Sequence, residues 1–165
     1  IGMSHLLSGS ALCDDQRECV HAVHTAGNAL LSLIDSILDF SKIEAGRLEL
    51  VRLGFGLRET LEDTVEILAP KAHEKGIELN VFIDRRLANG RLGDATRVKQ
   101  IVVNFMNNAI KFTEEGYVEL RAEPCNRTDG DAISHWVRIC VRDTGIGIPP
   151  EQRNRFFQSF SQAHA

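Results

Sequence analysis

Residues 95–113, with the sequence ATRVKQIVVNFMNNAIKFT, decide the fold. Their apolar residues recur at helical spacing, which predicts an amphipathic helix packed against a sheet. The side expected to face that sheet carries Val98, Ile101, Val102, Phe105, Ala109 and Phe112. Because a helix turns by about 100° per residue, the polar residues form a separate stripe. That stripe consists of Arg97, Gln100, Asn104, Asn108 and Lys111.

The polar stripe contains residue types that suit a phosphate ligand. Asn104 and Asn108 lie one turn apart, although Glu, Lys or Gln would favour the helix more on a face that is only solvated. Amide oxygens can ligate a hard cation such as Mg²⁺ without adding negative charge beside a polyphosphate, and Lys111 can meet the phosphates. The helix alone does not distinguish this interpretation from a simply solvated face.

Residues 143–148, with the sequence DTGIGI, follow an apolar run and precede two prolines. The glycines allow the backbone to approach a ligand closely. At a strand end, Asp143 can accept a hydrogen bond from an exocyclic amine such as that of adenine, and Ile146 and Ile148 can line an apolar slot for the ring. A turn between a strand and a helix also uses Asp and Gly for structural reasons, so this motif alone leaves both interpretations open.

The segments around these two motifs alternate between helical and strand-like patterns. Residues 57–75 have helical periodicity and end at Gly76. Residues 77–83, 117–122 and 136–142 are strand-like, and a loop is expected around Asn89 and Gly90. The order helix, strand, helix, strand, strand predicts an α+β fold, a sandwich in which helices cover one face of a sheet.

The N-terminal part predicts a helical hairpin. Apolar residues in 14–42 alternate in steps of three and four, and residues 2–7 resemble the end of a preceding helix, closed by the turn at 8–10. A lone hairpin exposes its apolar stripe, and two hairpins closing into a four-helix bundle is the simplest way to cover it. We therefore expect a homodimer, with domains at 1–46 and 55–165 joined by a linker at 47–54.

Composition restricts the class of protein. A content of 43% apolar and 25% charged residues is typical of a soluble globular protein, and the net charge of −4 gives no general basic field for nucleic acid or an anionic membrane. The four cysteines form no CxxC pair and the histidines show no metal-ligand spacing. No apolar run approaches the roughly 20 residues that span a bilayer. We expect a cytoplasmic segment without contact to nucleic acid or membrane.

Three motifs in order resemble those of sensor histidine kinases. Residues 104–113 resemble the N box of that family, residues 143–147 its first glycine box, and residues 155–162 its F box. Residues 38–46 resemble the end of the second helix of the dimerisation and phosphoacceptor domain, and residues 93–100 resemble the approach to the N box. The resemblance extends over nearly the whole chain and is greatest to hybrid kinases, which carry their own receiver domain.

This resemblance implies the Bergerat ATP-binding fold, shared with gyrases and heat-shock chaperones, after half of a dimeric four-helix bundle. It implies that ATP and Mg²⁺ are bound, with Asn108 as the Mg²⁺ ligand. Asn104 and Lys111 then lie at the phosphates, and Asp143 binds the adenine amine. The implied site residues are Asn104, Asn108, Lys111, Phe112, Asp143, Gly145, Gly147 and Ile148.

The family reaction transfers the γ-phosphoryl group of ATP to a histidine and then to an aspartate on the receiver domain of a response regulator. Motif spacing places the phosphoaccepting histidine roughly ten residues before Ile1, and no second glycine box occurs before Ala165. His5, His21 and His24 lack the family's H-E-x-R-T-P-like context. We therefore expect no catalytic histidine within this sequence and no autophosphorylation by it alone. An ATP-hydrolysing member of the same superfamily and a non-catalytic dimerisation scaffold are the alternatives.

Overall fold

The computed structural model describes residues 2–10, 12–129 and 132–149, with the backbone alone at 4, 5, 8, 32, 126–129 and 132–135. The chain divides into two compact units, Ile1–Leu50 and Val51–Ala165.

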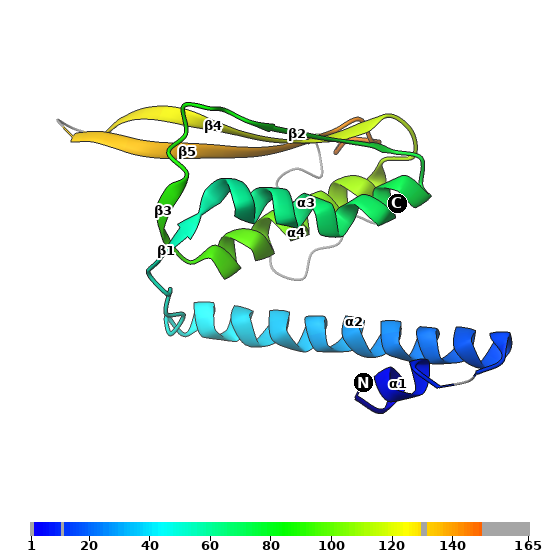
Figure 1. Ribbon diagram of the computed structural model, residues 1–165. Helices are drawn as coiled ribbons and strands as arrows, with labels where there is room; N and C mark the ends of the chain where they lie inside the picture. Colours follow the sequence, from blue (N-terminus) through cyan, green and yellow to red (C-terminus); the bar gives the residue numbers. More distant parts are fainter. Residues whose placement is uncertain (1, 11, 130–131, 150–165) are drawn as a thin grey trace. The chain divides into compact units, whose positions relative to one another are not determined.

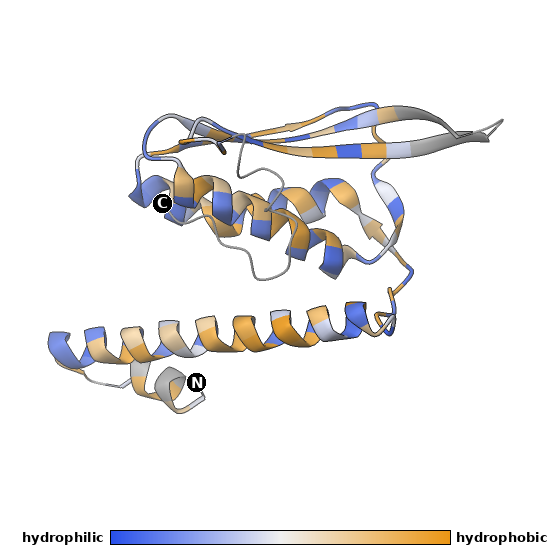
Figure 2. Ribbon diagram, turned by 180° about the vertical axis from the view of Figure 1, so that it is seen from behind, coloured by the Kyte–Doolittle hydropathy of each residue, from blue (hydrophilic) through white to orange (hydrophobic). Residues whose placement is uncertain are grey.

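The first unit is a helical hairpin of α1 (Gly2–Ser8) and α2 (Asp14–Glu44). Apolar residues recur along α2 (Figure 2), and they are exposed; Leu30 and Ile34 expose 59% and 43% of their surface. None of the side chains described in this unit is buried. One copy of the hairpin therefore leaves its apolar stripe uncovered. Neither α2 nor any other described helix has the length and apolarity needed to cross a membrane.

The second unit contains a three-stranded sheet of β2 (Glu78–Ile83), β4 (Tyr117–Asp129) and β5 (Ala132–Asp143), in the order β2-β4-β5. β2 is parallel to β4, and β4 is antiparallel to β5. Helices α3 (Leu57–Glu74) and α4 (Ala95–Phe112) lie side by side on one face of the sheet (Figure 1). The α+β fold and its one-sided helical layer, both predicted from the sequence, are confirmed.

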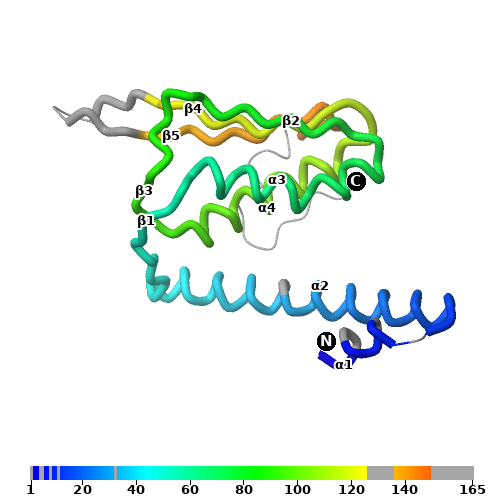
Figure 3. The backbone as a smooth tube through the Cα atoms, in the orientation of Figure 1, coloured from blue at the N-terminus to red at the C-terminus, as the bar shows by residue number. Residues whose placement is uncertain are grey.

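Two short strands were not predicted. β1 (Leu53–Gly56) and β3 (Gly90–Gly93) follow each other closely in space (Figure 3). They pair antiparallel, with Leu53 opposite Gly93 and Gly56 opposite Gly90. The sequence predicted a linker at 47–54 and a loop around Asn89 and Gly90 in these places. Each strand has four residues of which two are glycines, and glycine weakens the strand signal because it supplies no side chain to pack.

The core of the second unit lies between the sheet and its two helices. Alternate residues of β4, including Val118 and Leu120, point to one face and are fully buried. They join Leu61 of α3 with Met106 and Ile110 of α4, which are also fully buried.

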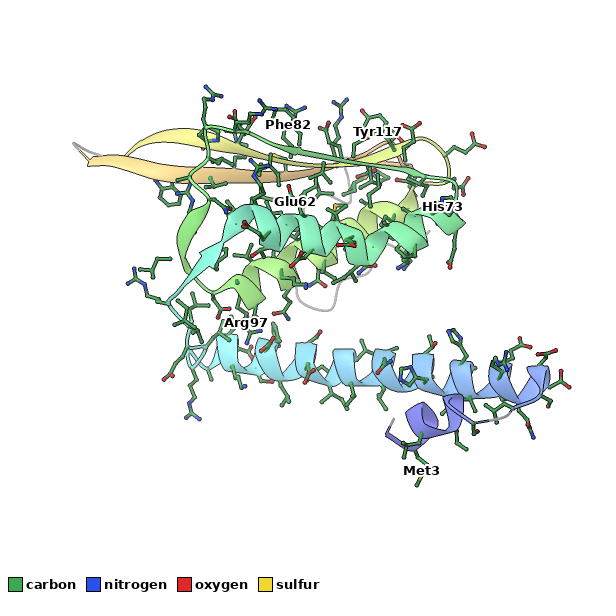
Figure 4. All side chains as sticks on the ribbon, in the orientation of Figure 1. Met3, Glu62, His73, Phe82, Arg97 and Tyr117 are labelled. Atoms are coloured by element: carbon green, nitrogen blue, oxygen red, sulfur yellow. The ribbon has the colours of Figure 1, made fainter. Side chains whose placement is uncertain are left out.

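The outer face of the sheet carries charged and aromatic side chains instead. Phe82, labelled in Figure 4, lies there, and the guanidinium of Arg121 is 4.6 Å from its ring centroid. The contrast between the two faces explains why the strands alternate in polarity along their length.

The buried face of α4 differs in part from the prediction. Ile101 and Phe105, expected to pack on the sheet, are 55% and 58% exposed, and Phe112 is also exposed. Met106 and Ile110 are buried instead, because α4 packs against α3 as well as against the sheet. The remaining apolar side of α4 forms a shallow hollow of about 250 Å³ against β5. Its lining residues are Val98, Ile101, Val102, Phe105, Ile139 and Val141.

Candidate functional site

The start of α4 is fixed by Asp94. Its Oδ1 accepts a hydrogen bond from the backbone N of Arg97 at 3.1 Å, and its Oδ2 accepts one from the backbone N of Val51 at 3.2 Å. The bond from Arg97 N is the largest cause that lowers the pKa of Asp94 below its ordinary value, and the bond from Val51 N lowers it further. A carboxylate also suits the positive end of the helix dipole. The polar stripe of α4 therefore begins from an anchored turn.

The polar stripe lies on the side of α4 opposite its buried residues. At its start, Nη1 of Arg97 (labelled in Figure 4) donates to Oε1 of Gln100 at 2.7 Å. Asn104, Asn108 and Lys111 follow it and are exposed. This side of the helix is accessible to a ligand.

The sides of α4 differ in what they contact. Lys111 Nζ lies 5.0 Å from the ring centroid of Phe112, next to the exposed stripe. Asn107, by contrast, accepts a hydrogen bond from Lys71 Nζ of α3 at 2.9 Å. Asn107 and Asn108 are adjacent in the sequence, yet one fastens α4 to α3 and the other is exposed.

The loop formed by residues 143–148 meets the C-terminal end of α4. The backbone N of Ile146 donates to the carbonyl of Phe112 at 3.3 Å. A Cβ added to Gly145 would collide with that same carbonyl, so glycine is required for the approach. The two motifs identified from the sequence, about 30 residues apart along the chain, thus meet in space.

A second set of contacts ties this loop to the start of β4. Thr144 N donates to the carbonyl of Tyr117 at 3.2 Å, and Tyr117 N donates to Thr144 Oγ1 at 3.0 Å. Gly116 has a φ of +105°, and a Cβ there would collide with Thr144 Oγ1. Sequence reasoning did not single out Thr144 or this role of Gly116. A glycine directly before a strand was the available signal.

Asp143 is exposed at the end of β5 and keeps capacity for a ligand. Its Oδ1 accepts a hydrogen bond from Gly145 N at 3.0 Å. A carboxylate has about four acceptor positions, so this bond leaves room for a further donor. Gly147 adopts a φ of +68°, which favours glycine, and Ile148 is exposed beside it.

Comparisons with known proteins fit this arrangement. Residues 93–165 match the family described as histidine kinase-, DNA gyrase B-, and HSP90-like ATPase. The chain is 39% identical over 168 residues to the signal transduction histidine-protein kinase BarA of Escherichia coli (strain K12), an alignment covering 100% of the chain and 18% of that protein. It is 37% identical over 163 residues to hybrid signal transduction histidine kinase B of Dictyostelium discoideum, covering 98% of the chain and 8% of that protein. Residues 93–165 belong to this ATPase family, and the whole chain aligns with sensor histidine kinases.

A solved structure extends the likeness to three dimensions. Full-length ShkA in complex with AMPPNP matches with a TM-score of 0.76 and 37% identity, covering 98% of this chain and 33% of the ShkA chain. The chain thus spans less than a fifth of the length of BarA and a third of ShkA. The resemblance is confirmed, and so is the fold that it implies for the ATP-binding domain and for the helical hairpin that precedes it.

The exposed amides of α4 are of a kind that can ligate a cation together with phosphate oxygens. In the described part of the chain, no group of three or more His, Cys, Asp or Glu side chains could hold a metal ion. An exposed amide such as Asn108 suits Mg²⁺, which is usually bound by one or two protein oxygens together with substrate phosphates and water. The expected F box at 155–162 lies outside the described residues.

Proposed function

We propose that this chain supplies the ATP-binding part of a sensor histidine kinase, which phosphorylates a histidine with ATP and passes the phosphoryl group to an aspartate of a response regulator. The junction between α4 and the loop at 143–148 carries this proposal. The hydrogen bond from Ile146 N to the Phe112 carbonyl joins the loop that carries the exposed Asp143 to the end of α4, the helix that carries the exposed amides and the Lys111 ammonium. Those groups match the phosphate and adenine ends of ATP.

The phosphate end is assigned to α4. We assign Asn108 as the Mg²⁺ ligand and Asn104 and Lys111 as phosphate contacts. Mg²⁺ neutralises charge on the phosphates when it is bound. The neutral amides add no negative charge beside them, and the lysine ammonium donates hydrogen bonds to phosphate oxygens. These residues position and neutralise the phosphates, which is most of what phosphoryl transfer requires of a protein.

The adenine end is assigned to the loop. Asp143 accepts a hydrogen bond from the adenine amine, while its Oδ1 keeps the bond from Gly145 N. Phe112 and Ile148 border the base, and both are exposed. Gly145 and Gly147 give the loop its shape, since one lies against the Phe112 carbonyl and the other has a positive φ.

The partners follow from the same proposal. The uncovered apolar stripe of α2 supports a homodimer in which two hairpins form a four-helix bundle, because an isolated hairpin cannot bury Leu30 or Ile34. A receiver domain accepts the phosphoryl group, and in hybrid kinases that domain belongs to the same polypeptide. The cytoplasm supplies the ATP that this chemistry needs.

The test uses a protein that carries this sequence with its flanking segments, labelled ATP and Mg²⁺. We expect label on protein that is acid-labile and base-stable, as phosphohistidine is. Label released only as free phosphate would favour the ATP-hydrolysing alternative, and the absence of nucleotide binding would favour the dimerisation scaffold.

Substitutions at adjacent asparagines test the site itself. Asn108→Asp places a negative charge beside the phosphates, so we expect the Kd for Mg-ATP to rise at least about tenfold. Asn107→Asp is the matched control, because Asn107 contacts Lys71 of α3 rather than the proposed ligand. Equal affinities of the two variants would contradict the assignment.

A further inference from the structure

Lys75 closes the C-terminal end of α4 from the neighbouring helix. Its Nζ donates hydrogen bonds to the carbonyls of Ile110, Lys111 and Thr113 at 2.8, 3.1 and 2.8 Å. The last carbonyls of a helix have no partner within the helix and carry partial negative charge. An ammonium has three N–H donors, so one side chain satisfies three of these acceptors.

The turn that Lys75 closes is the turn that meets the loop at 143–148. Phe112 lies between Lys111 and Thr113, and its carbonyl accepts the hydrogen bond from Ile146 N at 3.3 Å. Gly145 approaches the same carbonyl so closely that no side chain fits between them. Any change in the path of residues 110–113 therefore moves the point at which the loop is attached.

The backbone around Lys75 is itself fixed. Gly76 has a φ of +70°, and its N donates to the carbonyl of His73 at 2.9 Å. Ile77 N donates to the carbonyl of Ala72 at 3.0 Å, and Glu78 N donates to the carbonyl of Gly116 at 2.9 Å. The turn that carries Lys75 is therefore held in place by backbone hydrogen bonds. One of these bonds joins it to Gly116, the glycine that lies against Thr144 Oγ1.

We propose that Lys75 is a positioning residue of the nucleotide site, holding the end of α4 so that Phe112 and Lys111 keep their places relative to Asp143. This inference rests on the proposed function. Lys75 does not touch the nucleotide; it acts through the carbonyls of residues 110, 111 and 113. Its removal weakens nucleotide binding without removing any group that contacts the ligand.

The experiment compares two lysines of the same helical segment. Lys75→Met removes the three hydrogen bonds to the end of α4, and Lys71→Met removes an equal charge and the single bond to Asn107. The Kd of each full-length variant for Mg-ATP is measured well below its unfolding midpoint. We expect Lys75→Met to weaken binding about tenfold and Lys71→Met to change it less than about twofold, because only the former loses several bonds to a charged donor at the site.

Two further measurements separate positioning from general stability. The amide hydrogen of Ile146 should exchange faster in Lys75→Met than in Lys71→Met, since its acceptor is Phe112. Lys75→Gln keeps a donor without the charge, so we expect an intermediate Kd. If Lys75→Met does not fold, Lys75→Gln decides, and wild-type affinity in that variant overturns the proposal.

The outcomes distinguish this inference from the proposed function. If Lys75→Met binds Mg-ATP as Lys71→Met does while Asn108→Asp binds weakly, the positioning role is wrong and the nucleotide site stands. If the unsubstituted protein binds no nucleotide, or if Asn108→Asp binds as well as the unsubstituted protein, the proposed site fails and the role of Lys75 fails with it.

Discussion

The two units of the chain differ in where their cores come from. In the second unit, Leu61, Met106 and Leu120 are fully buried within a single copy. In the hairpin, no described side chain is buried, and α2 exposes Leu30 and Ile34. The unit with the proposed nucleotide site can therefore keep its geometry in one copy, whereas the apolar stripe of the hairpin is covered only in the proposed dimer.

The largest expected effect is on assembly. Leu30→Glu combined with Ile34→Glu places four carboxylates, two from each copy, in the proposed bundle. An unpaired buried charge costs several kcal/mol, so we expect the dimer Kd to rise at least about a thousandfold. Sedimentation velocity measures it.

The matched control puts the same charges on the other side of α2. Thr25→Glu with Ser36→Glu introduces two carboxylates per copy on the side of α2 opposite the apolar stripe. This variant should remain dimeric, and both variants should keep the thermal unfolding midpoint of the second unit. An unchanged dimer affinity after the two substitutions in the apolar stripe would refute the bundle, and so would a loss of dimers in the control.

The opposite disruption should act on the second unit alone. Leu61 of α3 is fully buried in the core that α3 and α4 form with the sheet, so Leu61→Ala leaves a cavity. We expect it to lower the free energy of unfolding of this unit by about 3 kcal/mol. Chemical denaturation measures that value, and Ile67→Ala, on the exposed side of α3, serves as the control. A matching change in dimer affinity would show that the units are not energetically separate.

The same contrast explains what the sequence predicted well. The hairpin, the long helices and the strands β2, β4 and β5 have repeated apolar patterns, and those patterns are visible without tertiary information. The polar stripe of α4 was also predicted, because residues 104, 108 and 111 share a side on any helix. The meeting of α4 with residues 143–148 was implied only by the family resemblance, since no local pattern specifies which segments touch.

What the sequence did not predict depends on tertiary contacts. The burial of Ile101 and Phe105 was predicted wrongly, because the apolar pattern of a helix does not reveal that α4 packs against both a helix and a sheet. The roles of Lys75 and Thr144 arise from contacts more than 25 residues away in the chain. Such contacts leave no periodic signal.

A smaller effect is expected from a single methyl group at the loop. Gly145→Ala puts a Cβ against the Phe112 carbonyl, so the loop must shift. We expect a loss of about 1–3 kcal/mol, as for other overpacked sites, and weaker binding of Mg-ATP. Gly54→Ala is the control, because its Cβ would meet nothing within 4 Å. If the two alanine variants match in stability and affinity, the close approach of Gly145 does not shape the site.

The smallest expected effect is a pH dependence confined to the second unit. The pKa of Asp94 is lowered mainly by the hydrogen bond from Arg97 N, and that of Asp84 is lowered to about 2 by Arg86. A lowered pKa means that the stabilisation is present above the ordinary aspartate value of about 3.9 and is lost as the pH falls through the folded-state value.

Asp94→Asn keeps a helix-capping side chain, so at neutral pH it should lower the unfolding midpoint only slightly. That difference should disappear in acid, whereas the difference caused by Asp84→Asn should persist toward about pH 2. Thermal unfolding measured across this range tests both, and a midpoint difference for Asp94→Asn that does not change with pH would show that its charge contributes nothing to the start of α4.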